Sequence, residues 1–112
     1  MLVPAGAGPT QVGLMMTLAH AYLLVKARSC LAALADDDAA TFDQSVAYES
    51  LLLRLDVLHG DDSPACEPMP GVGRADLLLL AEAAIEGLVE FGIDALSIEL
   101  LLADLEDTSM LV

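Results

Sequence analysis

The chain has 112 residues, of which 56% are hydrophobic, and its 18 acidic residues outnumber four basic ones to give a net charge of −14. This length predicts a single domain. So few cations argue against a nucleic-acid partner and against an anionic membrane surface, because both need clustered Lys or Arg. Residues 1–11 contain no Lys or Arg, so they lack the basic region of a signal peptide, and we expect a cytoplasmic protein.

The N-terminal third is expected to hold a flexible arm and one long helix. Residues 1–9 contain two prolines and two glycines, which indicates an arm, and residues 10–112 would form the single helical domain. Residues 10–35 contain no proline, and their apolar side chains cover nearly the whole helical circumference. Such a helix is buried on several sides, so we expect the other helices to pack around it. Lys26 and Arg28 interrupt the apolar run, which argues against a membrane span.

A second helix is predicted over residues 39–58. Asp37 or Asp38 would cap it, since a carboxylate accepts hydrogen bonds from the first free N–H groups of a helix. Glu49 lies between two apolar arcs of this helix. One arc comprises Phe42, Val46, Leu53 and Val57, and the other comprises Tyr48, Leu51, Leu52 and Leu55.

The C-terminal half contains a long loop and two further helices. Residues 59–73 include three prolines and three glycines, which predicts a loop of a length that is usually functional or disordered. A third helix is expected over residues 74–91, ended by Gly92 in the left-handed conformation. Asp94 would cap a fourth helix over residues 95–107, on which Leu96 and Leu100 lie away from the main apolar stripe.

These elements predict an all-α fold, an antiparallel four-helix bundle in which two helical hairpins are joined by the long Pro/Gly loop. A domain of this size has a high ratio of surface to volume, and it cannot bury so much leucine and alanine alone. Exposed apolar patches usually mark interfaces. We therefore expect a homodimer with two-fold symmetry.

Residues 91–107, FGIDALSIELLLADLED, resemble the segment around the prosthetic-group site of acyl carrier proteins. That family pairs a glycine turn with Asp-Ser-Leu and then an acidic, leucine-rich helix. Ala95 stands where the resemblance implies the serine that carries phosphopantetheine, and it has no hydroxyl to modify. Helix caps at Gly92 and Asp94 account for the same residues, so no cofactor is expected.

Arg54 and His59 are separated by four residues, a spacing that resembles the Arg-x4–6-His pair of HEPN-type ribonucleases. The resemblance implies an acid–base role for the histidine and phosphate stabilisation by the arginine. Without that role, Arg54 is a solvated or ion-paired helix residue, and His59 favours the negative end of the helix dipole. The negative charge of the chain opposes RNA binding.

Four side chains could carry acid–base chemistry: His20, Tyr22, Glu49 and His59. We expect Glu49 to meet Lys26, Arg28 or His20 across a helix pair, either as a structural ion pair or as a perturbed carboxylate in a pocket.

The chain has no Glu-x-x-His pair, P-loop, dinucleotide fingerprint or zinc spacing, so no metal or cofactor is expected. Cys30 and Cys66 form no metal motif, and a disulfide between them remains open.

Two functions follow from these features. The first is an acidic helical homodimer that serves as a protein-interaction adaptor or regulator without catalysis, with a second copy and a basic protein surface as partners. The alternative is a small cofactor-free enzyme, or a protein that binds a small hydrophobic ligand. Its interhelical pocket would use the four acid–base side chains, with the 59–73 loop as a lid.

Overall fold

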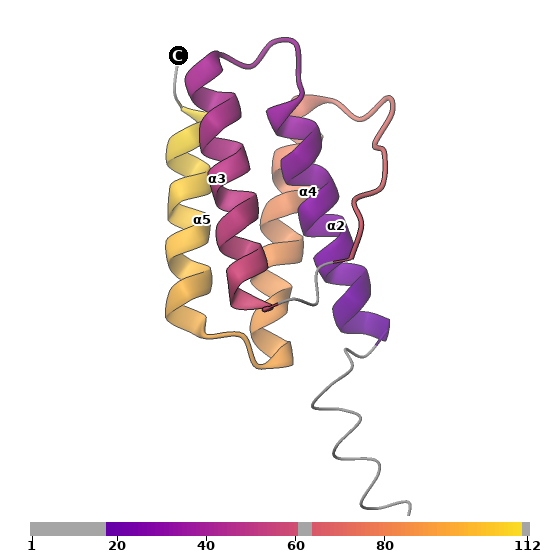
Figure 1. The fold of residues 1–112 in the computed structure, drawn as a ribbon, viewed down its shortest axis with the longest axis vertical. Coiled ribbons are helices and arrows are strands. Elements are labelled where there is room, and N and C mark those ends of the chain that lie inside the picture. The colour runs from indigo at the N-terminus through magenta and orange to yellow at the C-terminus, as the bar shows by residue number, and fades with distance from the viewer. Residues whose placement is uncertain (1–17, 61–63, 111–112) are drawn as a thin grey trace, which may run out of the picture.

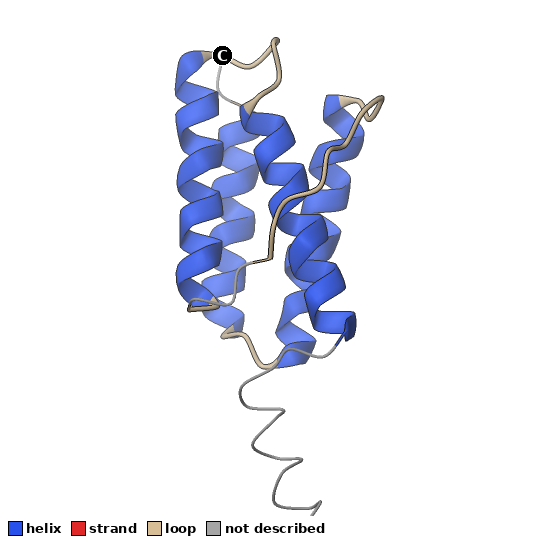
Figure 2. Cartoon of the chain, turned by 45° about the vertical axis from the view of Figure 1, so that its right-hand side comes forward, coloured by secondary structure: helices blue, strands red, loops and turns tan. Residues whose placement is uncertain are grey.

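The computed structural model describes residues 18–60 and 64–110, and all regular secondary structure in these ranges is helical (Figures 1 and 2). The all-α prediction is confirmed for this part of the chain. The predicted arm and the start of the first helix at residue 10 lie outside the described residues. The elements are α2 (Leu18–Ala35), α3 (Phe42–Leu58), α4 (Arg74–Gly87), the short 3-10 helix η1 (Leu88–Phe91) and α5 (Ala95–Ser109).

The helices form a four-cornered bundle. α2 and α5 each pack against both α3 and α4, whereas α2 and α5 lie diagonally across the bundle from each other, as do α3 and α4. In Figure 1, α2 and α5 run in one direction and α3 and α4 in the other. Every pair of packed helices is therefore antiparallel, and the two diagonal pairs are parallel.

The direction of α4 explains the long connection after α3. Because these two diagonal helices are parallel, α4 begins at the end of the bundle where α3 also begins. The chain must return along the whole of α3, whose 17 residues span about 25 Å. Residues 64–73 make this return beside α2, without helix or strand (Figure 2).

Helix α2 is the most deeply buried of the four. Its C-terminal two thirds contribute most to the core, and it packs against α3, α4 and η1. The prediction of a helix surrounded on several sides is only partly confirmed, because Leu18, Ala19 and Tyr22 are exposed and α2 occupies a corner. Its mean hydropathy of 1.3 would also suit a membrane span, but a core helix has the same composition, and here α2 packs as one. Its buried residues are Leu24, Ala27, Ser29, Cys30, Leu31, Leu34 and Ala35.

The start of α3 differs from the prediction. The hydroxyl of Thr41 accepts a hydrogen bond from the backbone N–H of Gln44 at 3.1 Å, and Gln44 Oε1 accepts from the Thr41 N–H at 3.0 Å. This reciprocal capping box satisfies two N–H groups, more than a single carboxylate at that position would. Asp37 instead accepts from the N–H of Ala39 within the turn. The predicted caps, Asp37 and Asp38, are therefore wrong.

The predicted junction between the last two helices is confirmed. Gly92 has a φ of 91° and ends η1, and the carboxylate of Asp94 accepts from the N–H of Ser97 at 3.0 Å to cap α5. Near the end of α4, a Cβ on Gly87 would lie 2.9 Å from Leu23 Cδ1. The missing side chain thus lets α4 approach α2 closely.

Candidate functional site

Helix α3 carries two apolar stripes on opposite sides, and the bundle buries only one of them. Tyr48 and Leu55 face the core and are completely buried. On the other side, Phe42 is 81% exposed, Leu53 65% and Val57 78%. One helix thus supplies a core surface and an equally apolar outer surface that the described fold does not cover.

Helix α5 extends this outer surface. Leu96 and Leu100 on α5 are 62% and 52% exposed. Between α3 and α5 lies an open groove of about 340 Å³. We call this surface the α3/α5 face and define it by Phe42, Val46, Leu53 and Val57 of α3 with Leu96 and Leu100 of α5. The groove within it is lined by Ser50, Leu53, Arg54, Val57, Leu58, Ser97, Leu100 and Leu101.

Charged side chains border this face. Arg54, at the groove, forms an ion pair with Asp104 across the two helices. Glu49 belongs to the outer stripe of α3 by its helical position, and it is exposed. The expectation that Glu49 meets Lys26, Arg28 or His20 between helices is therefore wrong.

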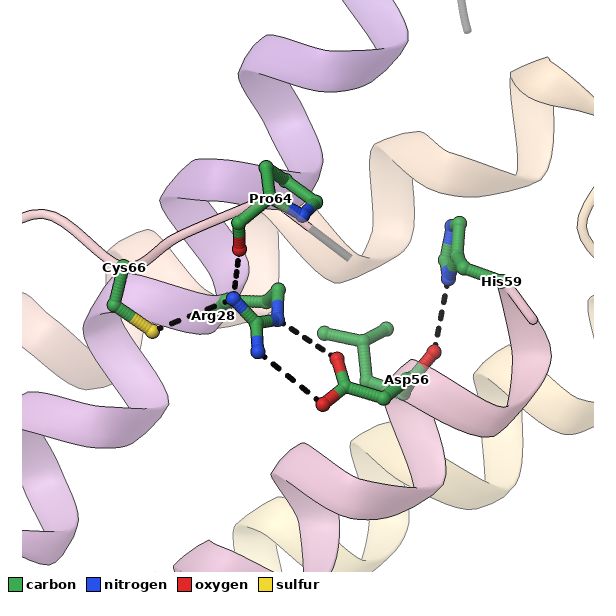
Figure 3. Close-up of polar contacts among 6 residues, drawn as sticks. Arg28, Asp56, His59, Pro64 and Cys66 are labelled. Carbon is green, nitrogen blue, oxygen red and sulfur yellow. Dashed lines mark hydrogen bonds and ion pairs between the residues drawn. The ribbon is translucent and has the colours of Figure 1, made fainter. Parts of the chain in front are cut away.

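The ion pair between α2 and α3 belongs to Asp56 instead. Arg28 on α2 donates from Nε to Asp56 Oδ1 at 2.7 Å and from Nη2 to Oδ2 at 3.2 Å, a two-point contact (Figure 3). The side chains are 14% and 24% exposed. The hydrogen bond to Asp56 is the main cause that raises the pKa of Arg28. This pair links α2 to α3.

Arg28 and Ser29 also bind the connection between α3 and α4. Arg28 Nη1 donates to the carbonyl oxygen of Pro64 and lies 3.6 Å from Cys66 Sγ (Figure 3). The Ser29 hydroxyl accepts from the backbone N–H of Glu67 at 2.8 Å. Cys66 is a free, exposed thiol, and Cys30 is free and buried, so the possible disulfide is absent. Burial raises the pKa of the Cys30 thiol. Sequence reasoning missed this cluster, because its loop contacts have no periodic signal.

A pair of histidines joins α2 to the end of α3. Nε2 of His20 and Nε2 of His59 are 3.1 Å apart. His59 Nδ1 lies 2.9 Å from the carbonyl oxygen of Leu55, so Nδ1 carries the donated hydrogen. The ring of His20 stacks on Phe91 with centroids 5.0 Å apart and planes 11° apart. Burial first, and the neighbouring His59 second, lower the pKa of His20.

The structure brings together two of the four predicted acid–base residues. His20 and His59 are in contact, whereas Tyr22 is 62% exposed beside Lys26, whose Nζ lies 5.4 Å from its ring centroid. Glu49 lies on the outer side of α3, as described above. Arg54 and His59, the two residues with ribonuclease-like spacing, do not act together. Arg54 pairs with Asp104, and His59 contacts His20.

The part of the chain that the structure describes holds no group of three or more His, Cys, Asp or Glu side chains that could bind a metal ion. Comparisons with protein-family models, with curated proteins and with solved structures gave no match to this chain. Its function must therefore be inferred from the geometry and chemistry of its own surfaces.

Proposed function

We propose that this chain is an acidic helical homodimer that acts in the cytoplasm by binding other proteins, as an adaptor or regulator, without catalysis. The observation that carries this proposal is the α3/α5 face. Six large apolar side chains on two neighbouring helices are between 48% and 81% exposed. Contiguous apolar surface of this kind usually marks a protein interface.

A second copy of the chain is the occupant that the composition favours. The chain is 56% hydrophobic, and each of the four apolar side chains on the outer stripe of α3 is at least 48% exposed in the part of the chain that the structure describes. Two copies related by a two-fold axis would each present the same stripe and shelter the other. Rows of large apolar side chains at helical spacing are what such isologous helix packing uses.

The acidic charge points to a basic protein as the further partner. Only four Lys and Arg residues stand against 18 acidic ones, and Arg28 and Arg54 are already ion-paired within the chain. A dimer would therefore expose a mostly negative surface, which attracts a basic surface and speeds association with it.

The dimer is tested by sedimentation equilibrium with a matched pair of variants. Leu53 on the α3/α5 face and Leu79 on α4 are almost equally exposed, at 65% and 64%. Leu53→Glu should convert the dimer to a monomer, because it places a charge within the interface, and Leu79→Glu should leave the dimer intact. A wild-type chain that remains a monomer at micromolar concentration would refute the proposal.

The basic partner is tested separately by ionic strength. Proteins captured from a lysate on the immobilised wild-type dimer should be released as salt is raised from about 0.1 to 1 M, because screening shortens the reach of surface charges. Capture that does not depend on salt would contradict an acidic binding surface.

A small hydrophobic ligand is a second candidate, favoured by the groove between α3 and α5. Its volume of about 340 Å³ lies at the lower end of the range for ligand pockets. None of the four predicted acid–base residues lines it, so the groove suits binding rather than catalysis. Mass spectrometry of the purified protein tests this alternative, since a retained ligand should be lost in Leu100→Glu.

A further inference from the structure

His20 and His59 are the only two histidines of the chain, and the fold places them in contact. They are 39 positions apart, yet their Nε2 atoms lie 3.1 Å from each other. Each comes from a different helix end, His20 from the first described turn of α2 and His59 from the residue that ends α3. Packing alone does not require imidazoles at this corner, since apolar side chains would fill it.

The two rings are held in fixed orientations. The carbonyl oxygen of Leu55 accepts from His59 Nδ1 at 2.9 Å, which leaves a lone pair on His59 Nε2, the atom that faces His20. A carbonyl behind one ring nitrogen is the usual support for a histidine that binds a metal through the other. Stacking on Phe91 orients the ring of His20.

Metal ions bind neutral imidazole, and protons compete with them. The net charge of −14 raises the concentration of cations near the chain.

We propose that His20 and His59 together bind one transition-metal ion that prefers imidazole, such as Ni²⁺, Cu²⁺ or Zn²⁺, with water in its other coordination positions. Two metal–nitrogen bonds of about 2.05 Å at a tetrahedral angle place the nitrogens about 3.3 Å apart. The observed separation of 3.1 Å therefore needs to widen only slightly. When the ion binds, the hydrogen on His20 Nε2 moves to Nδ1 of the same ring, so that both neutral imidazoles direct an Nε2 lone pair at the ion.

This ion would fasten the first described turn of α2 to the end of α3. Because the described residues offer no third side-chain ligand, we expect an affinity of about micromolar, below that of a four-ligand structural site. The proposal is independent of the α3/α5 face, so failure of one leaves the other standing.

The test is calorimetric titration of the full, untagged chain with Ni²⁺ and Zn²⁺ at about pH 7.5. An excess of Mg²⁺, which prefers oxygen ligands, occupies the carboxylates beforehand. We expect one ion per chain and a loss of about tenfold or more in affinity for both His20→Gln and His59→Gln. Asp38→Asn, which removes one charge from the exposed turn after α2, is the control and should bind as the wild type does.

Two outcomes would overturn the proposal: no saturable binding by the wild-type chain, or equal binding by the wild type and both histidine variants. Circular dichroism checks that each variant folds. Should a variant unfold, nuclear magnetic resonance of the wild type with paramagnetic Ni²⁺ decides the matter. Signals of His20, His59 and Phe91 should broaden first, and broadening confined to residues 36–38 would show that the ion binds the acidic turn instead.

Discussion

The inner side of α2 and the outer side of α3 have similar sequence patterns and opposite environments. Leu24, Leu31 and Leu34 on α2 are completely buried, whereas Leu53 and Val57 on α3 are mostly exposed, at 65% and 78%. Both sets recur at helical spacing, so each predicts an apolar stripe along one side of its helix. The difference teaches that periodicity locates an apolar stripe and leaves open whether the same chain or another covers it.

The largest expected effect separates these two stripes directly. Leu31→Ala should lower the free energy of unfolding by about 3 kcal/mol, because it removes buried methyl groups and leaves a cavity. Leu53→Ala should cost the isolated bundle less than about 0.5 kcal/mol and instead weaken the proposed dimer. Urea unfolding at two protein concentrations measures both effects. Equal losses that do not vary with concentration would show that the two stripes are equivalent.

The two Arg–Asp pairs extend the comparison from apolar to charged contacts. Arg28→Ala should cost about 2 kcal/mol, since it leaves the mostly buried Asp56 without its partner and frees the 59–73 connection. Arg54→Ala should cost about 0.5 kcal/mol or less, because its pair with Asp104 is 42% and 48% exposed. Urea unfolding gives the energies, and limited proteolysis should cut the connection faster in Arg28→Ala only. Matching values for the two variants would contradict this assignment.

The caps before α3 provide a smaller test. Thr41→Ala should cost about 1 kcal/mol, because it removes the hydroxyl that accepts from the Gln44 N–H. Asp38→Ala, in the same turn, should have almost no effect, as this side chain is exposed and does not cap the helix. Thermal unfolding of the two variants measures these losses of stability. A larger loss for Asp38→Ala than for Thr41→Ala would show that the aspartate caps the helix after all.

The smallest expected effect depends on pH. The pKa of His20 is lowered in the folded chain, so below the unfolded value of about 6.5 the unfolded state binds more protons than the folded state. Stability should therefore fall as pH decreases through about 6.5, and less so in His20→Gln. Urea midpoints for both proteins between about pH 7.5 and 5.5 measure this. Parallel curves would show that His20 does not contribute.

Local features of the fold could be predicted from the sequence. Gly92 and Asp94 ended and capped helices as expected, because each acts through its own backbone or its nearest neighbours. The capping box of Thr41 and Gln44 had a sequence signal, a threonine followed three residues later by glutamine, that the aspartates obscured.

Contacts between distant residues could not be predicted in the same way. Glu49 and Asp56 lie seven residues apart on the same edge of α3, so the helical pattern gave no reason to pair Arg28 with one and not the other. Which of the two carboxylates meets Arg28 depends on the position of α3 along the axis of α2, and that position is set by the packing of the whole bundle. The meeting of His20 with His59 has the same origin.

The crossover between α3 and α4 has a consequence for how the two halves of the chain associate. Among the described residues it is the one covalent link between the α2–α3 hairpin and the α4–α5 hairpin, and those hairpins otherwise meet through packing of α2 against α4 and η1 and of α3 against α5. Cleavage within the connection should give two fragments, one with α2 and α3 and the other with α4 and α5, and these should reassociate into a native complex.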